Sequence, residues 1–305
     1  MTRMRAVWSF WSKPFRTGTS WPWREPIHHL LAWGLSVRLA RSHYPDTMLV
    51  TDTPGRALLV DALGLPFSVV STALDALGNA DPTFWMAGKL LAYSLQDEPF
   101  IHLDTDVFLW RPLPANIASA PVFAQHKDVF QVTDYSGPRV IEDAFARAGL
   151  TLPAEWQWFR SHQARHYHEA NCGILGGTSP GFFRHYAQLA MDLALNPAHA
   201  GAWASVPFLV GLNPTVEQFV LSACVDYHRF DPCSDHRGRY IRYLFPSAAH
   251  AWDPEYARRA GYTHLLGPGK QHPETTARLV ERVRSEDPDF YARCLAADGG
   301  LTRNP

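Results

Sequence analysis

Short apolar runs alternate with helical stretches through the first third of the chain. Residues 28–43 carry apolar side chains at the spacing of a helix, and the apolar runs on either side are of β type. The pattern predicts strands at residues 5–10, 47–51, 67–70 and 99–103, and helices at residues 28–43, 56–63 and 82–95. This alternation favours an α/β fold, in which helices flank a mixed, mostly parallel central sheet.

The middle of the chain differs from both ends. Residues 129–167 are polar and aromatic without clear periodicity, so we expect an irregular insertion or lid at about residues 129–169. The remaining pattern predicts a strand at residues 171–176, helices at 180–195 and 214–227, and a helical tail within residues 273–305. Because no linker is long or polar enough to divide the chain, we expect one domain over residues 1–305.

Charge and cysteine content argue against several classes of protein. Lys and Arg number 28 and Asp and Glu 29, giving a formal net charge of −1, whereas a protein whose main task is nucleic-acid binding needs a basic excess. The four cysteines are too few and too scattered for a disulfide scaffold. Residues 193–216, the longest stretch without acidic or basic residues, contain three prolines, so we expect no transmembrane segment. A cytoplasmic protein is the prediction, with a peripheral membrane contact left open.

A pair of aspartates follows the strand predicted at residues 99–103. Asp104 and Asp106 stand between that strand and the apolar pair Val107 and Phe108. Ligands of open α/β sheets bind beyond the carboxyl ends of the strands, where this pair lies. Two carboxylates at this spacing can hold one divalent cation, Mg²⁺ or Mn²⁺. The alternative is a pair of solvated aspartates in a turn.

A polar segment nearer the C-terminus could complete such a site. His264 could add an imidazole ligand, and Gly267 and Gly269 allow the backbone to approach a ligand closely. Lys270 is a point charge that suits a phosphate. A Gly-Pro turn with an exposed lysine is the alternative.

Several blocks, in the correct order, resemble the glycogenin-like enzymes of glycosyltransferase family 8. The blocks are residues 35–38 with 49–52, residues 89–95 followed by Asp104-Thr105-Asp106, Asn171-Cys172-Gly173-Ile174, Glu217-Gln218, and His264-x-x-Gly267-x-x-Lys270. They span most of the chain, from residue 35 to residue 270. The resemblance implies a GT-A fold and the transfer of a hexosyl group from a UDP-sugar to an acceptor, with retention of anomeric configuration.

The resemblance also implies roles for single residues. Mn²⁺ (or Mg²⁺) would be held by Asp104, Asp106 and His264. The donor would be bound by Asp52, Lys89, Asp104, Thr105, Asn171, Gly267 and Lys270. The catalytic residues would be Asp106, Gln218 and Lys89. In this chemistry the metal and Lys270 neutralise the charge that develops on the departing nucleoside diphosphate.

Four features depart from the family pattern, one of which is that Val107 and Phe108 follow Asp106 directly, where a Thr is expected before the apolar pair. The opening strand reads Trp8-Ser-Phe-Trp-Ser-Lys-Pro, Glu217 stands where the family has Asp, and residues 155–169, rich in Trp and His, have no counterpart. These differences indicate a divergent branch with a different acceptor, which could be a peptide or protein, a saccharide or a small molecule.

Tryptophan is the most unusual feature of the composition. The chain has eleven, and five of them fall within the first 33 residues. Trp33 lies on the apolar side of a predicted helix and is expected in the core. Four others are expected in loops, where aromatic faces suit sugars and peptide side chains: Trp21, Trp23, Trp156 and Trp158. The candidate acceptor-binding residues are Trp156, Trp158 and His166.

Two groups of histidines have more than one interpretation. One group has spacings that could suit tetrahedral Zn²⁺: Cys224, His228, Cys233 and His236. A buried Cys224 followed by a polar loop is the favoured alternative. A second group could act as acid–base residues or ligands, although an exposed polar loop is favoured: His162, His166 and His168.

Two other functions stay open at this point. The altered opening strand and the Trp-rich segments suit a non-catalytic GT-A-like module that binds a nucleotide sugar or a peptide. The same carboxylates would also suit a metal-dependent nucleotidyltransferase or phosphotransferase.

Overall fold

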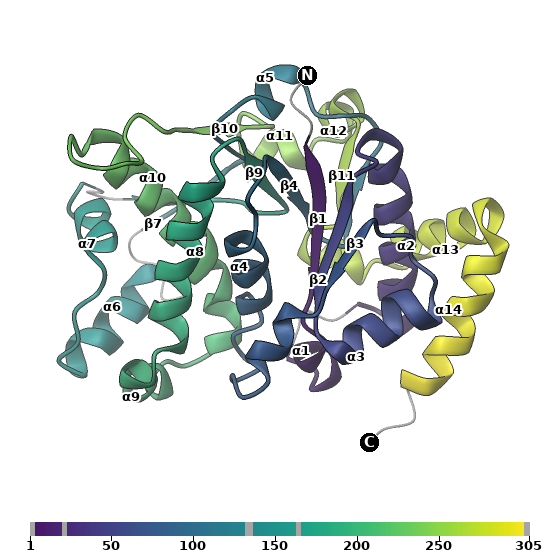
Figure 1. The fold of residues 1–305 in the computed structure, drawn as a ribbon, viewed down its shortest axis with the longest axis horizontal. Helices are drawn as coiled ribbons and strands as arrows, with labels where there is room; N and C mark the ends of the chain where they lie inside the picture. Colours follow the sequence, from purple (N-terminus) through teal and green to yellow (C-terminus); the bar gives the residue numbers. More distant parts are fainter. Residues whose placement is uncertain (1–3, 20–22, 132–136, 163–165, 302–305) are drawn as a thin grey trace.

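A seven-stranded sheet forms the centre of the molecule, and helices cover both of its faces (Figure 1). The structure is a computed structural model that describes residues 4–19, 23–131, 137–162 and 166–301. The predicted fold class is confirmed, because the sheet is mixed, mostly parallel and flanked by helices.

The order of strands in the central sheet is β10-β6-β9-β4-β1-β2-β3. Their bounds are β1 (Arg5–Phe10), β2 (Thr47–Thr51), β3 (Val69–Ser71), β4 (Phe100–Leu103), β6 (Val122–Ala124), β9 (Ile174–Gly177) and β10 (Ile241–Tyr243). Strand β9 runs antiparallel to its neighbours β4 and β6, and the other pairs are parallel. The strands predicted in the first third of the chain are therefore all present, with β3 displaced by one or two residues.

Two pairs of short strands lie outside the central sheet. Strands β5 (Val107–Leu109) and β11 (Tyr262–His264) pair antiparallel, with His264 opposite Val107. Strands β7 (Lys127–Gln131) and β8 (His166–Ala170) also pair antiparallel. The first pair matters most for function, because it brings the C-terminal part of the chain beside the aspartates that follow β4.

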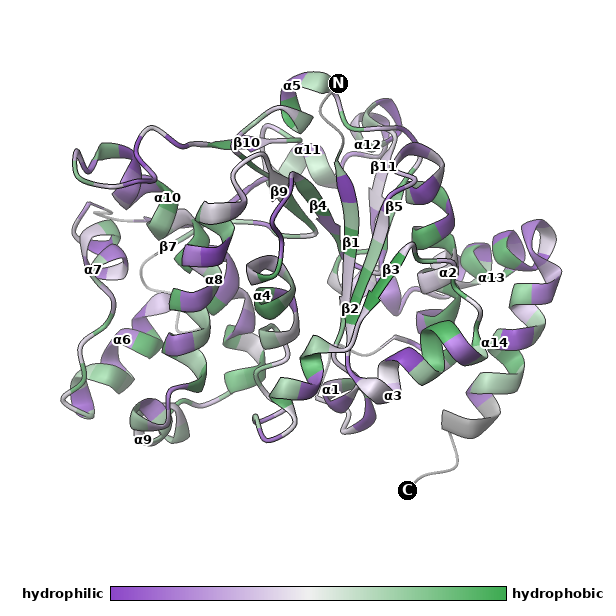
Figure 2. Cartoon of the chain, in the orientation of Figure 1, coloured by the Kyte–Doolittle hydropathy of each residue, from purple (hydrophilic) through white to green (hydrophobic). Residues whose placement is uncertain are grey.

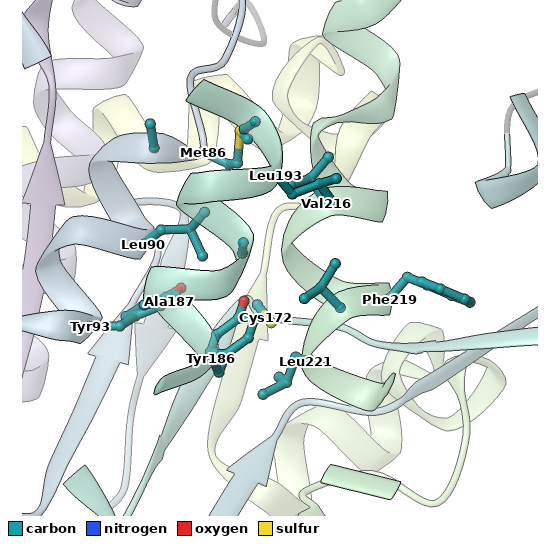
Figure 3. Packing of buried hydrophobic residues seen from close by; sticks show 14 of the residues in the cluster. Met86, Leu90, Tyr93, Cys172, Tyr186, Ala187, Leu193, Val216, Phe219 and Leu221 are labelled. Carbon is teal, nitrogen blue, oxygen red and sulfur yellow. The ribbon is translucent and has the colours of Figure 1, made fainter. Parts of the chain in front are cut away.

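The central sheet separates two hydrophobic cores. Side chains of a strand point alternately to its two faces, and in β1 Val7 enters one core while Trp8 and Phe10 enter the other. The helices of the Trp8 side are α2 (Pro26–His43), α13 (Pro273–Glu286) and α14 (Pro288–Leu301). Those of the Val7 side include α4 (Ala87–Ser94), α8 (Pro180–Leu195) and α10 (Val220–Phe230), which pack together in Figure 3.

Shorter helices complete both layers. They are α1 (Ser12–Arg16), α3 (Thr53–Arg56), α5 (Ala115–Ala118), α6 (Pro138–Arg147), α7 (Ala154–Ser161), α9 (Ala200–Ala204), α11 (Ala248–Trp252) and α12 (Pro254–Ala260). Figure 2 shows mainly hydrophobic strands such as β4 and β9 at the centre, whereas outer helices such as α6 and α13 carry both hydrophobic and hydrophilic residues. This is the pattern expected for helices with one buried face.

The prediction that residues 129–169 are irregular is wrong for the part of this segment that the structure describes. The described part of this segment contains β7, α6, α7 and β8. Its aromatic residues Phe145, Trp156 and Phe159 are almost fully buried in the core on the α8 side. Single-sequence periodicity misses these elements because the helices are short and their buried face is built from large aromatic rings.

Helix boundaries account for most other differences. The helix predicted at residues 56–63 is a wide π-helical segment, Ala57–Ala62, preceded by α3. The helix predicted at 82–95 begins only at Ala87, after a series of turns. The C-terminal tail is helical as predicted, and it is divided into α13 and α14 at Asp287.

Among the described residues, a single helix of sufficient length and apolar content to cross a membrane does not occur. The segments Pro197–Ala204 and Leu209–Phe230 reach that length and composition only when taken together, and they are bent by 117° relative to each other.

Candidate active site

The two aspartates lie in the turn that joins β4 to β5. The backbone N–H of Asp104 donates to the carbonyl of Gly173 at 3.0 Å, and the N–H of Val107 donates to the carbonyl of Asp104 at 3.0 Å. This turn leaves the Asp104 side chain half-buried and buries Asp106, which is 3% exposed. The interpretation of both as solvated turn residues is therefore wrong for Asp106.

Strand β11 places His264 next to Asp106. The N–H of Leu265 donates to the carbonyl of Asp106 at 3.0 Å, and His264 Nε2 lies 3.5 Å from Asp106 Oδ2. One ligand atom each from Asp104, Asp106 and His264 fall within 4.8 Å of one another. The structure thus brings together the three residues that the sequence suggested as metal ligands.

The surroundings of His264 fit a role as a metal ligand. Gln125 Oε1 lies 2.7 Å from His264 Nδ1 and accepts a hydrogen bond from the Tyr262 hydroxyl at 2.5 Å. If His264 Nδ1 carries the proton and donates it to Gln125, the lone pair of Nε2 faces Asp106. A Cβ atom at Gly173 would lie 2.4 Å from the imidazole, so only glycine leaves room for the ring here.

The donor set also fits a divalent cation. Two carboxylates and one imidazole are ligands that Mn²⁺ accepts readily. Asp106 Oδ2 is buried and accepts no hydrogen bond of good geometry from the described residues. Its near neighbour is the ammonium of Lys270, at 2.6 Å. Although burial opposes ionisation, the charge of Lys270, with a further contribution from His264, outweighs it and holds the pKa of Asp106 well below its usual range.

A second lysine joins Asp104 to a buried glutamate. Lys89 Nζ lies 2.9 Å from Asp104 Oδ1 and 2.9 Å from Glu217 Oε1. Burial alone would lower the pKa of Lys89, but Asp104 and Glu217 together raise it above its ordinary value. Lys89 is therefore charged at every pH of interest.

Glu217 is a site residue that the sequence did not identify. It is fully buried, and its Oε1 accepts a hydrogen bond from the Tyr93 hydroxyl at 2.7 Å. The hydroxyl of Tyr186, a residue of the core on the α8 side (Figure 3), donates to the backbone carbonyl of Glu217 at 2.7 Å. The predicted catalytic residue Gln218 is half-buried, and neither Gln218 nor Glu217 is among the described residues that line the cleft, which Glu217 reaches through Lys89. The wide π-helical segment Thr215–Phe219 turns Glu217 inward at this point.

A cleft of about 190 Å³ opens beside the two aspartates. Its polar end includes the predicted residues Lys89, Asp104, Thr105, Asp106 and Lys270. Its other walls are largely aromatic and include Phe10, Trp11, Phe15, Trp23 and Trp85. Part of the tryptophan excess therefore surrounds the candidate site.

His29 of α2 forms part of the aromatic wall. Burial, with a contribution from the charge of Lys270, lowers the pKa of His29 to about 4. Its ring stacks on Phe15 with ring centroids 4.8 Å apart, and its Nε2 lies 3.1 Å from the indole nitrogen of Trp33. The ring is thus neutral near pH 7 and acts as a flat surface beside the charged residues.

Two predicted donor-binding residues accept hydrogen bonds from the backbone. Asp52 Oδ2 accepts from the N–H and the hydroxyl of Ser12 at 3.0 and 2.7 Å, and Oδ1 accepts from the N–H of Gly55 at 2.8 Å. Asn171 Oδ1 accepts from the N–H of Gly173 at 3.1 Å. Neither residue belongs to the described lining of the cleft. Asp52 is the N-cap residue of α3, because its side chain accepts a hydrogen bond from a backbone N–H of the first helical turn.

Gly267 opens the helical turn Gly267–Lys270. Its φ of +40° lies in the left-handed region, and a Cβ atom there would face open space. The backbone conformation therefore selects glycine at this position. The turn places Lys270 over the cleft, with Nζ 5.8 Å from the centre of the Trp23 ring.

The residues predicted to bind the acceptor do not lie in loops. Trp156 and Trp158 belong to α7, and Trp156 is 1% exposed and donates its indole N–H to Glu142 at 3.0 Å. Its rings are thus unavailable to an acceptor. Trp158 stacks on His162, and His166 is the exposed first residue of β8. Trp21 lies outside the described residues.

Strand β8 also changes the interpretation of the histidines near it. His166 and His168 are strand residues, and His168 Nε2 lies 3.6 Å from Asp226 Oδ2. His162 follows α7 and its Nδ1 lies 2.7 Å from the carbonyl of Trp158. These histidines are spread over two elements and are not among the described residues of the cleft.

These features define a class of protein. It is an α/β protein in which a carboxylate–imidazole cluster and two lysines lie beside one cleft. The chain belongs to a family of unknown function (DUF6734), whose sequence model matches residues 4–297. No curated protein matches the chain.

Two solved structures show a distant likeness in fold. One is the galactosyltransferase LgtC in complex with donor and acceptor sugar analogues, with 14% identity, a TM-score of 0.41 and coverage of 99% of this chain and 98% of that chain. The other is an active-site mutant of LgtC, with 14% identity, a TM-score of 0.35 and the same coverage. Likeness at this level carries no argument about activity or substrate, which must come from the site itself.

Proposed function

We propose that this protein is a metal-dependent glycosyltransferase that moves a hexosyl group from a UDP-sugar to an acceptor. The observation that carries the proposal is the convergence of Asp104, Asp106 and His264, in which the two aspartates line the polar end of an aromatic cleft. Lys89 and Lys270 lie at the same end. A nucleoside diphosphate needs both halves of such a cleft, a flat apolar part for its base and a cationic part for its phosphates.

The charged groups are suited to exchange partners when a donor binds. Asp104, Asp106 and His264 would hold Mn²⁺, or Mg²⁺, and such a cation stabilises the charge on a departing diphosphate. Lys270 now neutralises Asp106 at 2.6 Å, and the lysine side chain is 17% exposed. Once a cation neutralises Asp106, the ammonium of Lys270 is available to bind phosphate oxygens.

The aromatic walls fit the nucleoside part of the donor. Trp23 and Trp85 are half-buried, so each has ring surface exposed in the cleft beside Phe15. Stacking of a base on an aromatic ring contributes about 1–3 kcal/mol. This stacking would replace the base-recognition part of the opening strand, where the sequence departs from the family 8 pattern.

The buried pair of Lys89 and Glu217 would position the reacting groups. Lys89 contacts Asp104 and Glu217 at once, so its charge is fixed beside the metal ligands. Glu217, with Tyr93, would act through Lys89 as a positioning residue, and Gln218 stays the predicted catalytic residue beside it. We also propose that the transfer retains the anomeric configuration and that the acceptor could be a peptide or protein. Analysis of the reaction product would identify both the configuration and the acceptor.

The test incubates the purified protein with a set of UDP-sugars, with and without Mn²⁺, and follows binding by calorimetry and release of UDP. We expect Mn²⁺-dependent binding and slow donor hydrolysis. Asp106→Asn should abolish both, whereas Asp97→Asn, at a side chain that is 74% exposed, should change neither. Absence of binding and hydrolysis in the folded protein refutes the proposal. A transferred phosphate or nucleotide, detected by mass spectrometry, would identify a phosphotransferase or nucleotidyltransferase instead.

A further inference from the structure

Three helices on the α8 side of the sheet bring two histidines and a glutamate together. His185 of α8 and His228 of α10 face each other with their Nε2 atoms 2.9 Å apart. Glu155 Oε1, at the start of α7, lies 3.4 Å from both of these nitrogen atoms. We propose that Glu155, His185 and His228 form a second metal site, which binds Zn²⁺ and holds α7, α8 and α10 together.

The distances between the three atoms suit one tetrahedral metal ion. Zinc bonds of about 2.0–2.2 Å place neighbouring ligand atoms of a tetrahedron about 3.3–3.6 Å apart. The two carboxylate–imidazole distances of 3.4 Å fall in this range. The imidazole–imidazole distance of 2.9 Å corresponds to a narrower angle, about 90°, at the metal. A small separation of the two rings would bring this angle to the tetrahedral value.

A serine fixes the orientation that His228 needs as a ligand. Ser234 Oγ lies 2.8 Å from His228 Nδ1 and also accepts a hydrogen bond from the N–H of His236 at 3.0 Å. When Nδ1–H of His228 donates to this hydroxyl, the lone pair of Nε2 points to the centre of the cluster. Metal-binding histidines are characteristically held in this way through their second nitrogen.

Burial makes the cluster distinct from a group of surface charges. The side chains of Glu155 and His228 are 10% and 11% exposed, and that of His185 is 35% exposed. A carboxylate and an imidazole that are largely removed from water need compensation, which a shared cation supplies. The exposed edge of His185 provides access for the ion. Three protein ligands leave one position for water, the number found in open zinc sites.

This site differs from the zinc pattern suggested by the sequence. Of the four residues in that pattern, only His228 belongs to the convergent group among the described residues. Cys224 is fully buried, whereas Cys233 is exposed. The ring of His236 packs beside His185 and His228, at 5.2 and 5.6 Å between ring centroids, but it is not part of the convergent group. The missing partners, Glu155 and His185, come from helices that are distant in sequence.

The test uses the full chain with Asp106→Asn, so that the site beside the cleft is weakened. After treatment with a chelator, Zn²⁺ binding is measured by calorimetry, and Co²⁺ is used as a spectroscopic probe of coordination. We expect one equivalent of Zn²⁺, an intense visible Co²⁺ spectrum of the tetrahedral type, and an unfolding temperature raised by several degrees with Zn²⁺.

Further substitutions locate the ion. His185→Ala should weaken Zn²⁺ binding at least 100-fold, and Ser234→Ala should weaken it about 10–100-fold. The matched control is His250→Ala, because His250 Nδ1 also lies 2.8 Å from a serine hydroxyl, that of Ser247, but has no convergent carboxylate and imidazole among the described residues. This control should bind Zn²⁺ like its parent.

Three results would overturn the proposal. They are absence of saturable Zn²⁺ binding by the folded parent, an unchanged affinity in His185→Ala, and an equal loss in His250→Ala. If His185→Ala does not fold, Glu155→Gln preserves the shape of the side chain and should show the same loss. A weak Co²⁺ spectrum of the octahedral type in the Asp106→Asn chain would also count against the site. This measurement requires no substitution of Glu155, His185 or His228.

Discussion

Gly173→Ala tests whether the candidate active site depends on the position of His264. A Cβ atom at this residue would lie 2.4 Å from Cε1 and Nδ1 of His264 and 2.3 Å from Gln125 Oε1. Favourable contacts of carbon begin at about 3.5 Å. The imidazole and the amide must therefore move by about 1 Å, although neither the metal ligands nor the lysines have been changed.

The displacement should act on the metal site more than on the fold. Overpacking of this size costs about 1–3 kcal/mol of unfolding free energy. Loss of the hydrogen bond from His264 Nδ1 to Gln125 should weaken Mn²⁺ binding about 10–100-fold. A ligand misplaced by about 1 Å should also slow donor hydrolysis about 100-fold. The first quantity is measured by thermal unfolding, the second by calorimetry and the third by release of UDP.

A second glycine serves as the control for Gly173→Ala. It separates the effect of steric crowding from the effect of replacing a glycine by alanine. Gly201 of α9 has an ordinary backbone conformation, and a Cβ atom there would meet nothing within 4 Å. Gly201→Ala should leave Mn²⁺ binding unchanged and stabilise the protein slightly, by up to about 1 kcal/mol. If folded Gly173→Ala binds Mn²⁺ and hydrolyses the donor like the parent, His264 is not the metal ligand that we propose.

Three further substitutions address the charges and the aromatic core. Lys270→Ala should weaken UDP binding in the presence of Mn²⁺ about 10–100-fold, the worth of a lost charge-assisted hydrogen bond, while Lys127→Ala, at an exposed lysine, should not; calorimetry checks both. Burial, with added repulsion from Asp128 and Glu217, raises the pKa of Glu169 to about 8. The stability contributed by protonated Glu169 is therefore complete below the ordinary carboxyl pKa. It is lost as the pH rises through about 8. Denaturant unfolding from pH 5 to 9 should show a decline, at most about 5 kcal/mol, that Glu169→Gln reduces. Trp156→Ala should cost about 3–5 kcal/mol of unfolding free energy and leave donor binding unchanged, which equilibrium unfolding and calorimetry distinguish from a role in acceptor binding.

Local patterns in the sequence predicted the centre of the fold well. Strands β1, β2 and β4 and helices α2 and α8 were recognisable, because each has a clear apolar period and an obvious boundary. The segment at residues 129–169 was not, because its helices are only ten and eight residues long. Helices of that length depend on tertiary packing, here of Trp156 and Phe159 on Phe219, which a local pattern does not contain.

The same distinction holds within the candidate site. Asp104, Asp106, His264 and Lys270 stand in short motifs, and the structure brings them together. Residues without such motifs were missed, although they complete the site. Gln125 orients His264, and Trp85 joins the wall of the cleft. Glu217 was visible only as a departure from a family pattern, and its partner Lys89 lies far away in the sequence.

The partners of the lysines would explain how a nearly neutral chain could hold the diphosphate site that we propose. Lys89 lies between Asp104 and Glu217, and Lys270 lies against Asp106, so each positive charge is already compensated inside the protein. Such pairs add little to the net charge of −1. A divalent cation that neutralised the carboxylates would release this positive charge toward the cleft, at the place where phosphates would bind. The cation and the diphosphate should therefore bind with positive coupling, because each neutralises charge that the other leaves uncompensated.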